Sequence, residues 1–129
     1  TIVRENGVYY RFTKNEKNNA ILLDTSRNLM GPWAEAPQFS LAKLRGYEGP
    51  TLFRQEAADG KPGSWLLLLD YYSRGQGYQP YVSNDLAGAQ FAPDKEFSTP
   101  YRFRHGSVLP VTAEEYARLK AAYPTPPAK

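Results

Sequence analysis

The chain has 129 residues, enough for one folded domain, and 41% of them are apolar. It has no cysteine, which excludes disulfides and thiolate chemistry. Its 16 basic and 13 acidic residues form no block of one sign, so we expect no nucleic-acid or membrane partner. No signal peptide or membrane span is visible, and a cytoplasmic, periplasmic or secreted location all stay open.

Strand-like segments dominate the chain as far as residue 111. They are rich in β-branched, aromatic and leucine residues and are separated by turn residues. The expected strands are residues 7–15, 20–26, 49–55, 64–72, 78–85 and 105–111. Pro80 lies inside the fifth of them and predicts an edge or irregular strand, because proline cannot donate to the ladder.

The end of the chain has a helical pattern instead. Thr112 and Glu115 have the spacing of a capping box, and Tyr116, Leu119 and Tyr123 then recur at helical intervals. We expect a short helix that Pro124 ends, so that residues 1–123 form one folded unit and residues 124–129 a flexible tail.

A short triplet recurs along the chain: "TIV" begins at residue 1, "TLF" at residue 51 and "SVL" at residue 107. Each is a hydroxyl residue followed by two apolar residues. A repeat of about 50 residues with about four strands per unit is typical of β-propeller blades. An ordinary β-sandwich with chance similarity is the alternative. The spacing gives about two and a half blades, so we expect an all-β partial propeller that does not close a ring.

Two chemically distinctive residues stand just before successive triplets. Glu48 comes three residues before Thr51, and the only histidine, His105, two before Ser107, next to Arg104. Because the first strand of each propeller blade lines the central channel, these positions predict that Glu48 and His105 converge on one axial site.

Each candidate site residue also has a purely structural explanation. Glu48 could cap backbone amides in a turn or pair with Arg45, and His105 could be a buried imidazole bonded to a backbone carbonyl. Asp24 and Asp70 could be acids, although aspartate often ends a strand as turn chemistry. Six tyrosines could stack on sugars or fill the core between blades (Tyr9, Tyr10, Tyr71, Tyr72, Tyr78 and Tyr81).

The segments "EGPTLF", "DYYSRGQGYQPYVSNDL" and "RHGSVLPVTAEEY", preceded by "NGVYYRFTKNE" and "SRNLMGPW", resemble the C-terminal part of a glycoside hydrolase family 43 catalytic domain. The resemblance covers nearly the whole chain. It implies a five-bladed propeller with arabinofuranosidase, β-xylosidase or arabinanase activity on arabinose- or xylose-containing oligo- or polysaccharides.

The resemblance also implies an inverting mechanism with a general acid, an aspartate base and an aspartate that tunes the acid. Glu48 of "EGP" matches the general acid, whose pKa must be raised. His105 of "RHG" matches a histidine that holds an axial water or a structural calcium, and no cofactor is required. Asp70 and Arg104 are expected sugar contacts near the channel mouth.

The other two acids of the family fall upstream of Thr1. We therefore expect this chain to be one part of a hydrolase, completed by N-terminal blades from the same gene or a second chain, or by self-association. By itself the chain should be essentially inactive, because loss of a general base typically costs 10² to 10⁴-fold. The alternative is a non-catalytic half-propeller that binds carbohydrate or protein.

Overall fold

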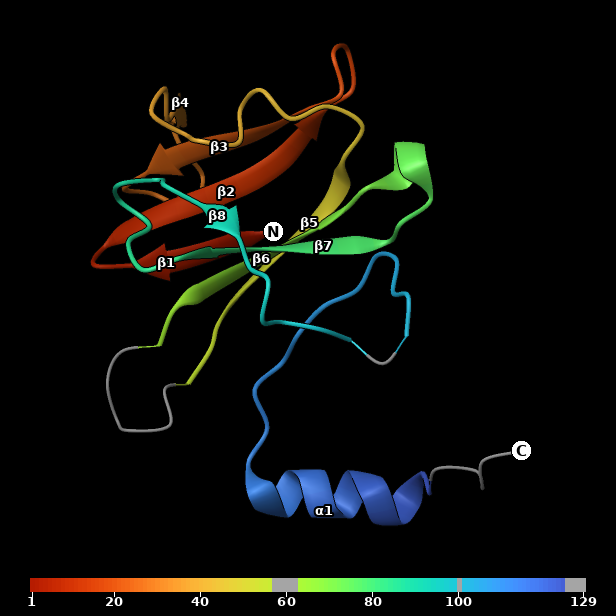
Figure 1. Cartoon of the computed structure of the whole chain (residues 1–129). Helices are drawn as coiled ribbons and strands as arrows, with labels where there is room; N and C mark the ends of the chain where they lie inside the picture. The colour runs from red at the N-terminus through yellow and green to blue at the C-terminus, as the bar shows by residue number, and fades with distance from the viewer. Residues whose placement is uncertain (57–62, 100, 125–129) are drawn as a thin grey trace.

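The computed structural model describes residues 1–56, 63–99 and 101–124, which form two antiparallel sheets of four strands each (Figure 1). The first sheet contains β1 (Ile2–Glu5), β2 (Val8–Asn15), β3 (Ala20–Ser26) and β4 (Ala34–Glu35). The second contains β5 (Glu48–Arg54), β6 (Trp65–Asp70), β7 (Tyr78–Ser83) and β8 (Ala92–Pro93). A 3-10 helix, η1 (Tyr72–Arg74), follows β6, and a helix, α1 (Ala113–Ala122), lies near the C-terminus.

The two sheets repeat one topology. In both, consecutive strands pair in chain order, from the first strand to a two-residue fourth strand. Residues 1–3, 50–52 and 106–108 line one cavity of about 450 Å³, so the three triplets of the repeat meet around a common centre. The fold is all-β, the sheets do not close on each other, and the arrangement is consistent with a partial propeller.

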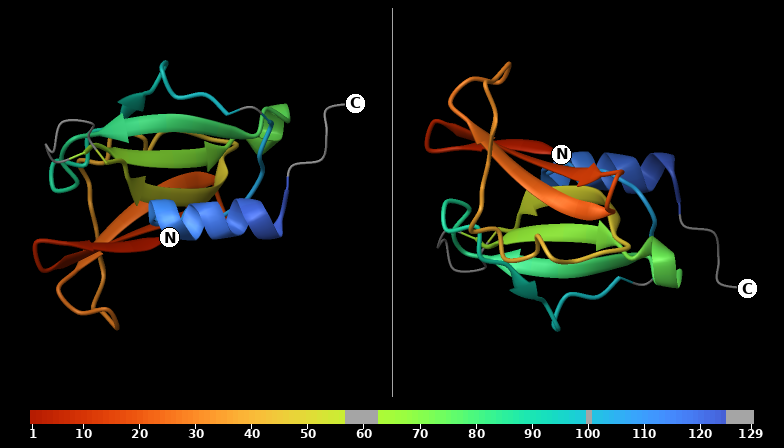
Figure 2. Two further views of the ribbon diagram at one scale, coloured as in Figure 1. Left: turned by 90° about the horizontal axis from the view of Figure 1, so that it is seen from below. Right: turned by 90° about the horizontal axis from the view of Figure 1, so that it is seen from above.

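The core lies between the two sheets, which face each other in both views of Figure 2. The side chains of β2 alternate as expected of a half-buried strand, with Tyr10 and Phe12 pointing inward. Phe12 is fully buried and meets Phe39 and Phe91 edge-to-face, with ring centroids 5.7 and 5.8 Å away. All six residues of β6 are buried, because this strand is central in the second sheet and covered on both faces.

Two of the strand predictions need correction. Residues 105–111 form no strand, since no backbone group of another described residue pairs with this segment and Pro110 has no N–H to donate. β7 is not an edge strand, because it lies between β6 and β8. Its Pro80 is tolerated because β8 is so short that it pairs only with Tyr81 and Val82.

The predicted capping box and short C-terminal helix are confirmed. Thr112 and Glu115 form the capping box, and α1 ends before Tyr123. No residue of α1 is buried. The predicted tail beyond Pro124 lies outside the described residues.

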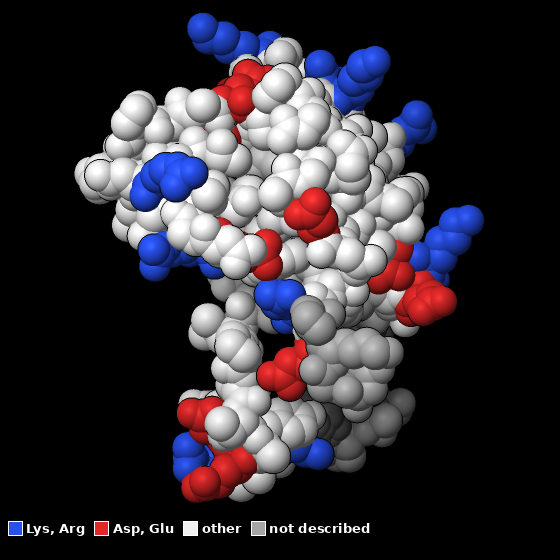
Figure 3. All heavy atoms as spheres, turned by 90° about the vertical axis from the view of Figure 1, so that its left-hand side faces the viewer, with Lys and Arg blue, Asp and Glu red and all other residues white. Residues whose placement is uncertain are grey.

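Among the described residues there is no helix long and apolar enough to span a membrane. On the face shown in Figure 3, charges of both signs are scattered among uncharged residues.

Candidate active site

The site begins where β5 begins. Glu48 is the first residue of β5 and lies opposite Asp70, the last residue of β6. The register of this pair shifts between Glu48 and Thr51, as in a β-bulge, and Gly49 there has φ +56°. Glycine tolerates this left-handed conformation without strain. The bulge therefore places two carboxylates side by side where β5 begins and β6 ends.

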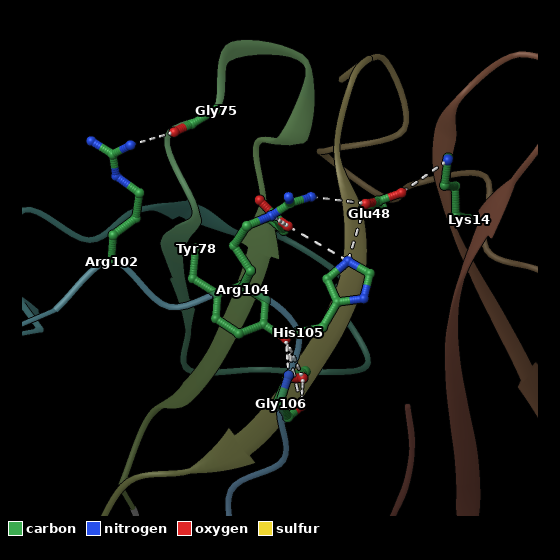
Figure 4. A network of polar contacts seen from close by, with 10 residues as sticks. Lys14, Glu48, Gly75, Tyr78, Arg102, Arg104, His105 and Gly106 are labelled. Atoms are coloured by element: carbon green, nitrogen blue, oxygen red, sulfur yellow. Dashed lines mark hydrogen bonds and ion pairs between the residues drawn. The ribbon is translucent and has the colours of Figure 1, made fainter.

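The segment after β8 folds back onto these carboxylates and is fastened on either side of residues 104 and 105. The amide of Tyr78 donates to the carbonyl of Phe103 at 3.0 Å. Beyond the histidine, the amide of Gly106 donates to the Tyr78 hydroxyl at 2.8 Å, and the Thr51 hydroxyl donates to the Gly106 carbonyl at 2.6 Å. His105 itself has φ +41°, an uncommon conformation for this residue. These contacts present two basic side chains to the carboxylates (Figure 4).

Three basic side chains surround the Glu48 carboxylate. His105 Nε2 lies 3.1 Å from Oε1, and Arg104 Nη2 lies 3.5 Å from the same oxygen. Lys14 Nζ donates to Oε2 at 3.2 Å. The predicted convergence of Glu48 and His105 is thus confirmed (Figure 4). Their proposed chemical roles stay predictions.

Two structural alternatives, the pairing of Glu48 with Arg45 and a buried His105, are wrong. Glu48 does not pair with Arg45, whose guanidinium donates to the carbonyls of Ala42 and Leu44. His105 is not a buried imidazole, because 56% of its side chain is exposed and its ring contacts carboxylates rather than a carbonyl. Both side chains instead take part in one cluster of charged groups.

Lys14 is a member of this cluster that the sequence motifs did not predict. It comes from β2 in the other sheet, and its Nζ also lies 4.7 Å from the centre of the Tyr72 ring. A signal existed, because Lys14 continues the inward-facing series of Tyr10 and Phe12 at every second position of the strand. A lysine on that face must find partners beyond the core, and Lys14 pairs with Glu16 at 2.9 Å as well as with Glu48 at 3.2 Å.

Asp70 is fully buried and accepts a hydrogen bond from Arg104 Nε at 2.9 Å. This bond raises the pKa of the Arg104 guanidinium. Asp70 also lies 3.5 Å from His105 Nε2, and its Oδ1 has no hydrogen-bond partner among the described residues. Because Asp70 is covered, the half-exposed Arg104 is the member of this pair that faces solvent.

The ionisation of Glu48 follows from these neighbours. Burial by itself raises the pKa of the carboxyl, but the hydrogen bonds and charge interactions with Lys14 and His105 outweigh it, so the pKa of Glu48 lies below its ordinary value. A carboxylate that accepts hydrogen bonds from cations is stabilised in its charged form. In this chain, Glu48 is therefore ionised at neutral pH.

The residues do not form a calcium cage. Glu48, Asp70 and His105 each offer one ligand atom, and these atoms lie within 4.8 Å of one another. Calcium takes six to eight oxygen ligands, whereas this set supplies two carboxylates and a nitrogen. Arg104 also already pairs with Asp70. The axial calcium that the resemblance implies thus has no adequate ligand set among the described residues.

The remaining candidates lie outside this cluster or at its rim. Asp24 forms an ion pair with Arg11 at 2.9 Å. Tyr10 and Tyr81 are buried in the core, and Tyr71 is stacked on Tyr47, so these three form no exposed sugar platform. Tyr72 and Tyr78 lie near the site. The ring of Tyr72 contacts Lys14, and the hydroxyl of Tyr78 accepts a hydrogen bond from the Gly106 amide.

Comparison with known protein families identifies the family of this chain. A family model described as a probable glycosyl hydrolase domain, related to glycosyl hydrolase family 43, matches residues 1–117. The chain belongs to this family. No curated protein and no solved structure matches the chain. In this family 43-related domain, the motifs "EGP" and "RHG", which precede the second and third triplets, meet in one polar cluster.

Proposed function

We propose that the domain supplies the general acid, Glu48, to an inverting glycoside hydrolase that cleaves arabinose- or xylose-containing glycosides. The observation that carries this proposal is the contact of Glu48 with His105 and Arg104, two residues that line a cavity of about 270 Å³. Glu48 is 22% exposed, so its carboxyl can reach a glycosidic oxygen, and Arg104 is available to a sugar hydroxyl.

Asp70 is not a suitable base for this reaction. An inverting enzyme keeps its two carboxyl groups about 6.5–9.5 Å apart so that a water fits between them. Ligand atoms of Glu48 and Asp70 lie within 4.8 Å, and Asp70 is fully buried. We therefore propose that the base belongs to another part of the complete enzyme, and that Asp70 acts by holding Arg104.

The lowered pKa of Glu48 sets a condition on this mechanism. A general acid must hold a proton at the working pH, which requires a raised pKa. A further carboxylate nearby and the exclusion of water by bound substrate both raise a carboxyl pKa. We propose that the complete enzyme provides both and thereby converts Glu48 from a carboxylate into an acid.

The same observation favours a second candidate function. An ionised Glu48 can accept hydrogen bonds from sugar hydroxyls, and Arg104 and His105 can donate to them, without any proton transfer. In that case the domain is a non-catalytic module that binds carbohydrate. The two candidates share the ligand class and differ in turnover.

Hydrolysis of nitrophenyl arabinofuranoside and nitrophenyl xyloside tests the proposal. We expect negligible turnover by purified residues 1–129 and clear turnover by the complete product of the gene. Robust hydrolysis by residues 1–129 would contradict the missing base. Calorimetric binding of a pentose oligosaccharide by the complete product, with no turnover, would favour the binding module.

A further inference from the structure

Arg102 is held beside the candidate site without a carboxylate partner. Its Nη1 donates to the carbonyl of Gly75 at 3.0 Å (Figure 4). Its side chain also rests against Gly77, where an added Cβ would lie 2.7 Å from Arg102 Cγ. No described carboxylate forms an ion pair with Arg102, whereas Arg104 pairs with Asp70 at 2.9 Å. The exposed Arg102 thus offers solvent a positioned guanidinium whose charge no described acid balances.

Arg102 and Arg104 belong to one short stretch of the chain. Residues 102–104 contain no helix, turn or bend, and the chain between the two arginines spans at most about 7 Å. Figure 4 shows that Arg104 reaches towards Glu48, while Arg102 reaches towards the turn at Gly75. A glycan whose pentose lies at Glu48 can therefore place a neighbouring sugar unit at Arg102.

Positive charge is in excess around Arg102. The acids that border the site already have cationic partners (Glu16 and Glu48 pair with Lys14, and Asp70 pairs with Arg104). Arg74, which directly precedes Gly75, is a further exposed cation, and the described residues give it no ion pair. A ligand that approaches Arg102 therefore meets an excess of positive charge, which favours an anionic group.

A carboxylate is the anionic group that suits Arg102. Among the described residues only Gly75 engages the guanidinium, through Nη1, so that Nε and Nη2 remain as donors along one edge. Such an edge matches a planar carboxylate with two parallel hydrogen bonds. Charge-assisted hydrogen bonds are also stronger than those to neutral groups, so a carboxylate gains more here than a sugar hydroxyl. In a glycan, this group is the carboxylate of a uronic acid.

We propose that Arg102 binds the carboxylate of a uronate unit next to the pentose at Glu48, so that the ligand of this site is an acidic pentose-containing glycan. The inference rests on the proposed function for the class of glycan, but it holds for a hydrolase and for a carbohydrate-binding module alike. The competing role of Arg102 is to fasten the turn at Gly75 and nothing more. In that role, its loss weakens the binding of neutral and acidic glycans equally.

Calorimetry with a matched pair of ligands tests the proposal. The ligands are a xylo-oligosaccharide that carries one glucuronate and the same oligosaccharide after reduction of its carboxyl group to an alcohol. The complete product of the gene carries Glu48→Gln in these titrations to prevent hydrolysis of the ligand. We expect the glucuronate form to bind about tenfold more tightly or better, because hydrogen bonds to charged groups are the stronger ones. Equal affinities for the two ligands, or no binding of either, would overturn the proposal.

Two arginine variants locate the effect. Arg102→Met removes the guanidinium and keeps an apolar stem against Gly77, and Arg27→Met, in the exposed loop after β3, is the control for net charge. We expect Arg102→Met to reduce the preference for the glucuronate form to about threefold or less and to keep the affinity for the reduced form within about twofold. Arg27→Met should change neither affinity.

Two results with these variants would overturn the proposal. One is an equal loss of affinity for both ligands in Arg102→Met, and the other is an equal loss of preference in Arg27→Met. Turnover of neutral nitrophenyl pentosides by the complete product without substitutions tests the proposed function separately. The acidic ligand and the hydrolase can therefore each fail without the other.

Discussion

Two regions of the molecule are stabilised by different interactions. One is the interior between the two sheets, and the other is the C-terminal segment (residues 101–124). The interior is closed by buried aromatic and aliphatic side chains, with Phe12 at its centre. The C-terminal segment has no buried residue, yet it brings Arg104 and His105 to the site. The comparison shows that buried packing closes one region, whereas hydrogen bonds and ion pairs fasten the exposed segment that completes the cluster.

The largest effect expected from this contrast is on stability. Phe12→Ala should lower the free energy of unfolding by about 3–5 kcal/mol, because it leaves a cavity among packed rings. Phe103→Ala, in the C-terminal segment and 46% exposed, should cost less than about 1 kcal/mol. Urea denaturation of both variants measures the difference. Similar losses would mean that the C-terminal segment carries as much of the fold as the interior does.

A glycine pair tests the close contact between the two regions. A Cβ at Gly49 would lie 2.8 Å from the His105 ring, whereas a Cβ at Gly75 would meet nothing within 4 Å. Both glycines have similar positive φ, 56° and 61°, so alanine should cost similar backbone strain at each, on the order of 1 kcal/mol. We expect Gly49→Ala alone to shift the NMR signals of the His105 ring. If Gly75→Ala shifts them equally, the ring does not rest on Gly49.

Lys14 links the first sheet to the site, and its removal should change the ionisation of Glu48. Lys14→Met should raise the Glu48 pKa, because it deletes a hydrogen bond and a positive charge that favour the carboxylate. Carboxyl carbon NMR titration measures this pKa, with the exposed Lys43→Met as control. If the Glu48 pKa does not change in Lys14→Met, or changes equally in Lys43→Met, Lys14 does not influence the ionisation of Glu48.

The lowered pKa of Glu48 also determines how the stability of the fold changes with pH. A carboxyl whose pKa is lower in the folded state stabilises the fold above its unfolded pKa, and this contribution is lost as the pH falls through the folded value. The wild-type chain should therefore lose stability over that acidic range more steeply than Lys14→Met. Denaturation series at several acidic pH values measure the two slopes.

The smallest effect is expected in α1. Thr112→Ala removes the side-chain cap that accepts from the amide of Glu115, so the first turn should fray. Because α1 has no buried residue, the unfolding midpoint of the sheets should not change. Hydrogen exchange of the α1 amides measures the first effect and urea denaturation the second. A lowered midpoint would show that α1 supports the sheets.

The sequence predicts the parts of the site that the repeat governs. Glu48, Arg104 and His105 precede equivalent triplets, and the structure brings their side chains together. Lys14 was not predicted, because its contact depends on how the first sheet packs against the second, and no local pattern encodes that packing. The prediction of a strand at residues 105–111 is wrong for a related reason. Strand propensity is present there, but pairing needs a neighbour, and no described residue supplies one.

The leaving-group dependence of hydrolysis tests the central claim, that Glu48 is the proton donor. The complete product of the gene and its Glu48→Gln variant are compared on a dinitrophenyl pentoside, whose leaving group needs no proton, and on a phenyl pentoside, whose leaving group does. We predict that Glu48→Gln loses about 10² to 10⁴-fold in kcat/KM on the phenyl substrate and under about tenfold on the dinitrophenyl substrate. Equal losses on both substrates, or none, would contradict the role of Glu48 as the acid.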